Sequence, residues 1–376
     1  MQSGDGLIVR LRLTNGICTA ALAHQIAHWS RQWGNGQIDL TNRANLQLRG
    51  LSARHLPALQ AALAHASLLD ATPAAEAVRN VIASPLAGLD PTAILDTRPI
   101  AAALEHRLTT DPTLHALPGK FGFAIDDGGL FPLDTVPADV RFEAHPGPAF
   151  TIHLAGSPTQ FGPCAPAAVP DIAAGIAHAF LRHPNTPRMR DLPAEAIGLI
   201  PAPASPPRTT HPHLGAHRLG TIAFLGIGLP FGRITADDLA SLATQTLHLT
   251  PWRAILIPLP TLSDAHALAA ALNPEAFILD LSDPRRRIAA CPGAPACIQA
   301  TTPTRRDAAT LAARLPPGPG IALHLSGCQK GCAHPAPASV TLVARNGRYD
   351  LIRNGTAASS PTLHGLTPDQ AASHLK

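Results

Sequence analysis

Two closely spaced pairs of cysteines constrain the fold of this chain more than any other feature of its sequence. Cys291 and Cys297 are separated by five residues, Cys328 and Cys332 by three, and 30 residues lie between the pairs. Four thiolates on two turns can enclose a four-iron cubane, in which each iron takes one sulfur from the protein. Structural zinc is usually held by pairs with two to four intervening residues, so the first pair is too wide for it. The spacing favours a 4Fe-4S cluster, with zinc or incidental buried thiols as alternatives.

The residues around these cysteines are small, namely Gly293, Ala294, Ala296, Gly327, Gly331 and Ala333. Small side chains let backbone amides approach inorganic sulfur and donate hydrogen bonds to it. The two remaining cysteines are expected to be packing residues, because Cys18 lies at a predicted helix start and Cys164 follows a Gly-Pro turn.

The rest of the composition excludes several classes of function. No apolar run approaches the ~18 residues of a membrane span, so no membrane partner is expected. The N-terminus lacks the basic start and apolar stretch of a signal peptide, which predicts a cytoplasmic protein with reduced thiols. Aromatic residues make up only 4% and no basic run is interleaved with them, so no nucleic-acid partner is expected. Lysine is rare: Lys120, Lys330 and Lys376 are the only ones.

The pattern of predicted elements occurs twice along the chain. A strand over 7–13, a helix, strands over 37–41 and 43–51 and a helix near residue 55 follow one another. After a proline-rich linker at 201–212, a similar order returns, with a strand at 219–227, a helix at 235–246 and two strands within 247–259. A constant offset of 209 relates Leu40 to Leu249 and Thr41 to Thr250. We therefore predict an internal duplication, against the alternative of two generic patterns matching by chance.

The segments between and after these units mix helices and strands. Helices are expected at 168–182, 261–272 and 305–314, and strands at 121–125, 139–143, 149–154 and 339–344. The whole is predicted to be an α+β protein of two equivalent halves, each with one small and one larger unit.

One predicted strand has the side-chain pattern of a binding platform. Along 43–49 the odd positions are Arg43, Asn45, Gln47 and Arg49, whereas the even positions are apolar. Because side chains alternate across a strand, the polar set would form one surface suited to a flat polyanion. A solvated sheet face is the alternative.

Several segments together resemble the siroheme-type nitrite and sulfite reductases. They are 324–332 (HLSGCQKGC) followed by 347–350 (GRYD), 40–50 (LTNRANLQLRG), 78–81 (VRNV) followed by 84–88 (SPLAG), and 117–121 (LPGKF). The resemblance implies a duplicated reductase-like architecture in which two ferredoxin-like half-domains and two mixed α/β domains are related by a pseudo-two-fold axis. The expected boundaries are 1–66 and 213–262 for the half-domains, and 67–200 and 263–376 for the mixed domains, the last carrying the cluster.

The resemblance also implies a tetrapyrrole site. The expected contacts to tetrapyrrole carboxylates are Arg43, Asn45, Gln47, Arg49, Arg79, Asn80 and Lys120. Lys120 and Lys330 are expected to act in catalysis, since an ammonium group can serve as a proton donor or a point charge.

Two departures from the reductases point to one branch of this superfamily. Gly122 stands where the reductases usually have a second lysine, and Lys330 stands where they usually have asparagine. The segment SGCQKGCAHP resembles instead the precorrin-3B synthases of aerobic cobalamin biosynthesis. A siroheme-dependent sulfite or nitrite reductase and a non-catalytic iron–sulfur protein are the alternatives.

The second resemblance implies an oxygen-dependent monooxygenase that converts precorrin-3A to precorrin-3B by hydroxylating the macrocycle and closing a lactone. The expected partners are the tetrapyrrole, dioxygen and an electron-donating reductase. The expected cofactors are the 4Fe-4S cluster, a mononuclear non-haem iron and NADH as electron source, without siroheme. With 19 histidines, the ligands of a mononuclear iron cannot be selected from spacing, although His153, His324 and His334 lie near informative segments.

Overall fold

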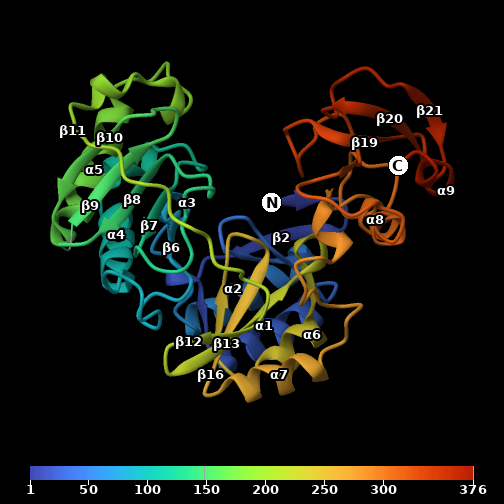
Figure 1. The fold of residues 1–376 in the computed structure, drawn as a ribbon, viewed down its shortest axis with the longest axis horizontal. Coiled ribbons are helices and arrows are strands. Elements are labelled where there is room, and N and C mark those ends of the chain that lie inside the picture. The colour runs from blue at the N-terminus through green and yellow to red at the C-terminus, as the bar shows by residue number, and fades with distance from the viewer. Residues whose placement is uncertain (148, 376) are drawn as a thin grey trace.

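The computed structural model describes residues 1–147 and 149–375, which form three lobes (Figure 1). A second lobe, from α3 (Pro73–Val78) to β11 (Pro201–Ala202), and a third, from β17 (Ile288–Ala290) onward, stand apart above the central lobe. The central lobe combines the N-terminal residues with the segment that follows β11. Among the described residues, no helix has the length and hydropathy needed to cross a membrane.

Two five-stranded sheets build the central lobe, and each contains one strand from the other half of the chain. The first has the order β1 (Gln2–Ser3), β2 (Gly6–Leu11), β5 (Leu46–Leu51), β4 (Gln37–Leu40), β14 (Arg233–Thr235). The second has the order β12 (Gly215–Leu219), β13 (Ile222–Gly228), β16 (Ala254–Leu259), β15 (Leu247–Leu249), β3 (Ile17–Cys18). Because β14 and β3 are exchanged, neither sheet is complete without the other half.

Helices cover these sheets at equivalent places in the two halves. Each exchanged strand leads into a helix whose N-cap is a threonine, Thr19 for α1 (Ala20–Trp33) and Thr235 for α6 (Ala236–Leu242). A threonine side chain accepts a hydrogen bond from a backbone amide of the first turn, which otherwise has no partner. The helices α2 (Leu56–His65) and α7 (Leu262–Ala271) follow β5 and β16.

The two outer lobes also repeat one topology. The second lobe has strands β6 (Val81–Ala83), β7 (Phe123–Asp126), β8 (Val140–His145), β9 (Ala149–Leu154), β10 (Gln160–Cys164) and β11, with helices α3, α4 (Arg98–Thr110) and α5 (Val169–Leu181). The third has β17, β18 (Leu323–Ser326), β19 (Ala338–Arg345), β20 (Arg348–Gly355) and β21 (Leu363–Leu366), with helices α8 (Thr304–Ala312) and α9 (Pro368–Ala372). In both sheets the first three strands are parallel and the next two pairings are antiparallel.

This repetition confirms the predicted α+β class and duplication, and the offset of 209 extends to the backbone. Ala44 and Arg253, 209 positions apart, have left-handed φ angles of 54° and 58° on the turns before β5 and β16. A left-handed φ is unusual for a residue with a side chain, so its recurrence at equivalent positions supports duplication over chance matching. The proposed domain boundaries themselves stay predictions.

One continuous hydrophobic core joins the two halves of the central lobe. Leu46 and Leu48 of β5 and Ile255 and Ile257 of β16 are all fully buried in it. Alternation along each strand places these apolar side chains on one face. Truncating one of them to alanine would cost about 2–5 kcal/mol, because the neighbours fill the resulting cavity only in part.

The prediction of a continuous strand over 43–49 was wrong. β5 begins only at Leu46, because Thr41–Asn45 forms a turn in which Ala44 adopts the left-handed conformation. The Thr41 hydroxyl accepts hydrogen bonds from the backbone amides of Arg43 and Asn45, and such local bonds favour a turn over a strand. Alternation therefore applies to Gln47 and Arg49, whereas Arg43 and Asn45 are placed by the turn.

Candidate functional site

The two cysteine pairs begin at the same edge of the third lobe's sheet. Cys291 directly follows β17, and Cys328 comes two residues after β18. These strands are parallel neighbours, so their carboxyl ends lie together. The Gly327 amide donates a hydrogen bond of 3.1 Å to the Cys291 Sγ, which joins the first loop to the second.

The other three cysteines of the two pairs influence the thiol of Cys332. The pKa of Cys332 is raised by partial burial and then by the charges of Cys328, Cys291 and Cys297, whereas Lys330 lowers it. Thiolates that come close to one another repel unless a cation binds between them. By contrast, burial raises the pKa of Cys18 to about 12 and that of Cys164 to about 11, so both stay protonated thiols.

The residues at the cysteine loops fit a cubane cluster. A Cβ on Gly327 would lie 3.3 Å from Cys291 Sγ and 2.6 Å from the Ala300 Cβ, so glycine is needed for the amide to approach the sulfur. In a cubane each cysteine binds a different iron, and the sulfurs need not meet at one point.

The expected mononuclear iron lacks a set of ligands among the described residues. Within residues 1–147 and 149–375, no three His, Cys, Asp or Glu side chains are placed to hold one metal ion. His324 and His334 have ring centroids 5.8 Å apart, but no third ligand joins them. The arrangement therefore does not fit the expected mononuclear site.

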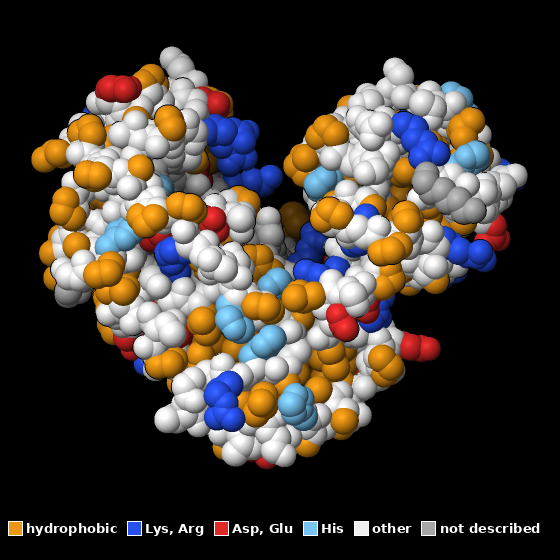
Figure 2. Space-filling view, viewed as in Figure 1, with side chains coloured by type: hydrophobic (Ala, Val, Ile, Leu, Met, Phe, Trp, Pro, Cys, Tyr) orange, Lys and Arg blue, Asp and Glu red, His pale blue; other side chains and the backbone are white. Residues whose placement is uncertain are grey.

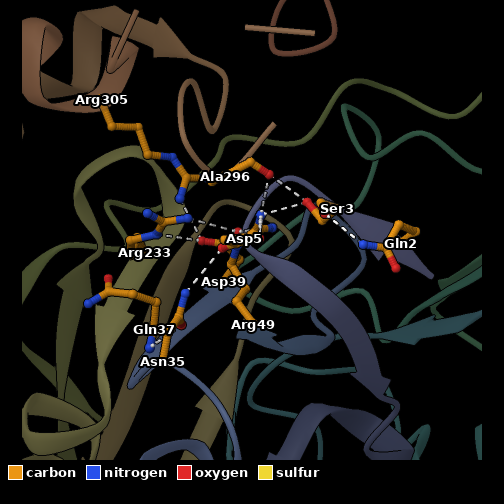
Figure 3. Close-up of polar contacts among 10 residues, drawn as sticks. All are labelled: Gln2, Ser3, Asp5, Asn35, Gln37, Asp39, Arg49, Arg233, Ala296 and Arg305. Atoms are coloured by element: carbon orange, nitrogen blue, oxygen red, sulfur yellow. Dashed lines mark hydrogen bonds and ion pairs between the residues drawn. The ribbon is translucent and has the colours of Figure 1, made fainter. Parts of the chain in front are cut away.

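The first cysteine loop is held by the N-terminal end of the chain (Figure 3). The carbonyl oxygen of Ala296, next to Cys297, accepts hydrogen bonds from the Ser3 hydroxyl at 2.5 Å and from Arg49 Nη2 at 2.9 Å. The backbone amide of Gly4 also donates to it at 3.3 Å. Three donors on one carbonyl fix the loop that carries Cys297.

Asp39 is the centre of the ion-pair network below that loop (Figure 3). Its carboxylate binds Arg49 at 3.2 Å, Arg233 of β14 at 2.9 Å and Arg305 of α8 at 2.6 Å. Burial alone would raise the pKa of Asp39, but the charges and hydrogen bonds of Arg305 and Arg233 lower it to about 2. Arg49, only 2% exposed, also binds Asp5, so most of its donors already have protein partners.

The residue of the second half that corresponds to Asp39 is His248, and it also contacts an outer lobe. His248, 209 positions after Asp39, donates from Nδ1 to the Pro85 carbonyl of the second lobe at 2.6 Å. Asp39 reaches the third lobe through Arg305. The same strand position thus connects the central lobe to a different outer lobe in each half.

Two other predicted residues, Arg43 and Lys120, lie together at a cavity lined by cationic side chains. Arg43 and Lys120 line a cavity of about 280 Å³, and Arg43 Nη2 donates to the Lys120 carbonyl at 3.1 Å. Asp139, Arg188 and Arg190 line the same cavity, and sequence reasoning missed them. The only local signal was two arginines on either side of Met189 in a proline-rich segment. Figure 2 shows Lys and Arg side chains on the flank of the second lobe that borders the hollow between the two upper lobes.

The remaining predicted contacts are placed elsewhere. Arg79 forms ion pairs with Asp70 at 3.0 Å and Glu105 at 3.5 Å, in a different cavity of about 590 Å³. Asn80 is buried and donates to the carbonyls of Gly119 and Phe121, so it holds the loop of Lys120.

The other sequence-predicted polar residues are dispersed around the central and third lobes. Asn45 is buried on its turn, and Gln47 is half-buried on β5. Lys330 is exposed beside Cys328 and lines a cavity of about 470 Å³ with Arg345, separate from the cavity of Lys120. The structure therefore does not bring the two lysines together.

Comparison with known proteins agrees with this architecture. The nitrite/sulfite reductase ferredoxin-like half domain matches residues 1–66, and the nitrite and sulphite reductase 4Fe-4S domain matches residues 74–157. The second match falls on the first copy of the duplicated mixed domain, whereas the paired cysteines lie in the other copy. Membership of this superfamily supports an iron–sulfur cluster in the protein.

Individual relatives narrow the assignment. A precorrin-3B synthase from Sinorhizobium sp is 36% identical, covering 97% of this chain and 83% of that protein. A ferredoxin–nitrite reductase from Synechococcus elongatus is 27% identical, covering 91% of this chain and 77% of that protein. The NirA protein of Mycobacterium tuberculosis superposes with a TM-score of 0.72 at 21% identity over 98% of this chain and 79% of its own, which shows the shared fold. The chain therefore belongs to the precorrin-3B synthase family, within the nitrite/sulfite reductase superfamily.

Proposed function

We propose that this protein converts precorrin-3A to precorrin-3B as an oxygen-dependent monooxygenase of cobalamin biosynthesis. The observation that carries the proposal is the similarity to a precorrin-3B synthase along 97% of the chain. In such a reaction one atom of dioxygen enters the macrocycle, the other leaves as water, and NADH supplies two electrons. The product carries a new hydroxyl group on the macrocycle and a lactone formed from an acetate side chain.

We assign to the cavity of Arg43 and Lys120 a part in tetrapyrrole binding, namely contact with the carboxylates at the edge of the macrocycle. Arg43 and Lys120 come from different lobes and line one cavity, so a ligand there would contact both. A guanidinium or ammonium group forms charge-assisted hydrogen bonds with a carboxylate, and the tetrapyrrole carries several carboxylates. Arg79 and Arg49 stay proposed contacts that would have to give up their present ion pairs. Asn45 and Gln47 stay proposed contacts as well, provided that the ligand extends towards them.

Electron transfer is the role we assign to the cysteine loops. Cys291, Cys297, Cys328 and Cys332 would hold a 4Fe-4S cluster, which passes single electrons when bound. Lys330 lies beside this position and would stabilise negative charge there. We keep NADH, a reductase partner and the absence of siroheme as proposals, together with a cytoplasmic location suited to reduced thiols.

Whether the protein also binds a mononuclear iron is a matter for metal analysis of the purified protein. The described side chains do not form a three-ligand group, so no step of the reaction is assigned to such an iron.

Purified protein tests the proposal directly. Anaerobic protein is expected to contain iron and labile sulfide in equal amounts near four per chain, the stoichiometry of a 4Fe-4S cluster. Precorrin-3A should be consumed only when dioxygen and an electron source are both present. Siroheme at one per chain, with turnover of sulfite or nitrite, would instead establish the reductase alternative that the nitrite reductase relatives suggest.

A further inference from the structure

The cavity around Arg43 and Lys120 is too small for a macrocycle. Its volume of about 280 Å³ is at the lower end of the ~300–1,000 Å³ that whole small-molecule ligands occupy. Its lining has four cationic side chains, Arg43, Lys120, Arg188 and Arg190, and one carboxylate, Asp139. A cavity of this size and charge suits one carboxylate arm of a larger ligand.

The two additional arginines, Arg188 and Arg190, lie on either side of a buried methionine, Met189. Met189 is 1% exposed in the core of the second lobe, and it begins a short 3-10 turn ending at Asp191. Arg188 and Arg190 flank this anchor, so their side chains are left on the outer side. Gly156 packs against the backbone of Arg190, where an added Cβ would lie 2.6 Å from the Arg190 carbonyl oxygen. The turn is therefore held in place from two sides.

Asp139 cannot neutralise the cations of the cavity, because it supplies one negative charge against four positive ones. Its carboxylate accepts a hydrogen bond from the Gly122 amide at 3.0 Å, and the nearby Met189 amide acts to lower its pKa. One carboxylate thus joins the loop of Lys120 to the turn of Arg188 and Arg190.

The cavity keeps an excess of positive charge. Burial, followed by the charges of Arg10 and Arg188, lowers the pKa of Arg43, and Asp139 opposes this only in part. Among the described residues, the Arg188 side chain forms no ion pair or hydrogen bond, and Arg190 has only a distant contact of 3.9 Å with Asp191. Convergent cations without matching acids attract an anion.

We propose that Arg188 and Arg190 complete a pocket, with Arg43 and Lys120, that binds one carboxylate arm of the tetrapyrrole. The macrocycle would then lie outside the pocket, in the hollow between the two upper lobes (Figure 2). This inference rests on the proposed function and adds two binding residues that no sequence motif indicated.

Fluorescence quenching of uroporphyrin III, a polycarboxylated porphyrin, by the cluster-loaded protein tests the pocket. The double variant Arg188→Gln, Arg190→Gln is expected to raise the Kd about 10-fold or more, because it removes two charge-assisted contacts. Arg182→Gln, an exposed arginine of the same lobe outside the cavity, is the matched control and should bind as the unmodified protein does. Exchange of both arginines for lysine should restore part of the affinity.

A single variant and a competition experiment complete the test. Arg190→Gln alone, at a side chain 70% exposed, provides a variant that should fold normally and should bind several-fold more weakly. Succinate at equal concentration should not compete, because a free carboxylate lacks the macrocycle; competition by succinate would indicate a site for small free acids and overturn the proposal.

Unchanged porphyrin affinity in folded Gln variants would overturn the pocket but leave the proposed function standing. If the unmodified protein did not bind the porphyrin, both the pocket and the proposed tetrapyrrole substrate would be contradicted.

Discussion

The guanidinium group of Arg49 donates a hydrogen bond of 2.9 Å to the carbonyl oxygen of Ala296, 247 positions later in the chain. Arg49 belongs to the first half-domain, and Ala296 lies between two of the paired cysteines. The contact therefore makes the shape of one cysteine loop depend on the far half of the duplicated chain.

Ser3→Ala is expected to make the cluster more labile. The variant removes the hydroxyl that donates to Ala296 at 2.5 Å, at a cost of about 1 kcal/mol, or roughly 5-fold in stability of the loop. The rate at which an iron chelator bleaches the cluster absorption measures this. Ser241→Ala, whose hydroxyl bonds within α6, is the control and should leave the rate unchanged. Equal rates in both variants would show that this bond does not hold the loop.

Asp39→Asn is expected to destabilise the fold by about 3–5 kcal/mol at neutral pH, since it leaves buried arginines without their shared anion. The pKa of Asp39 is lowered in the folded state from 3.8 to about 2. A depressed pKa stabilises the folded state above the unfolded value, by about 2 kcal/mol here, and this part is lost as the pH falls from 3.8 through 2.

Urea unfolding of the unmodified protein and of Asp39→Asn at several pH values measures this difference. The gap in unfolding free energy should be constant above about pH 5 and narrow towards pH 2. A gap that does not change with pH would contradict the assigned ionisation of Asp39.

Cys328→Ser is expected to abolish most of the iron and labile sulfide, because a cubane needs a thiolate for each iron. Cys164→Ala is the matched control. Burial raises the pKa of Cys164 to about 11, so it stays a thiol at neutral pH and does not suit a ligand. Iron and sulfide analysis of both proteins after anaerobic purification distinguishes a cluster ligand from a packing residue.

Lys120→Ala is expected to weaken tetrapyrrole binding about 10-fold while leaving the iron content unchanged. Lys120 is exposed and lines the cavity of Arg43, which is separate from the cavity beside Cys328. Lys120→Arg, which keeps the charge, should retain most of the affinity. Loss of the cluster in Lys120→Ala would refute the assigned role.

Gly122→Lys is expected to fold and yet not to reduce sulfite. A Cβ at this position would meet nothing closer than the Asn80 carbonyl oxygen at 3.6 Å, which is an ordinary contact. The added cation does not supply the siroheme that binds the anion in the reductases. Assay with a reduced dye as electron donor checks this; sulfite turnover by the variant alone would show that the missing lysine decides the reaction.

Local patterns in the sequence by themselves determined much of this protein. Alternation and helical periodicity placed most of the elements that they indicated to within a few residues, and the offset of 209 between Leu40 and Leu249 pointed to the duplication. These features are local or repetitive, so they depend on neighbours along the chain. The cysteine spacing likewise predicted two loops able to share one metal group.

Only the tertiary structure decided which cations are available. Arg43 and Arg49 lie in one motif, yet Arg43 lines a cavity whereas Arg49 is buried among Asp5, Asp39 and Ala296. The difference arises because Ala44 turns the chain and because the partners of Arg49 come from distant segments. The exchange of β3 and β14 and the approach of Arg188 to Lys120 have the same origin: contacts between residues far apart in sequence leave no periodic signal along it.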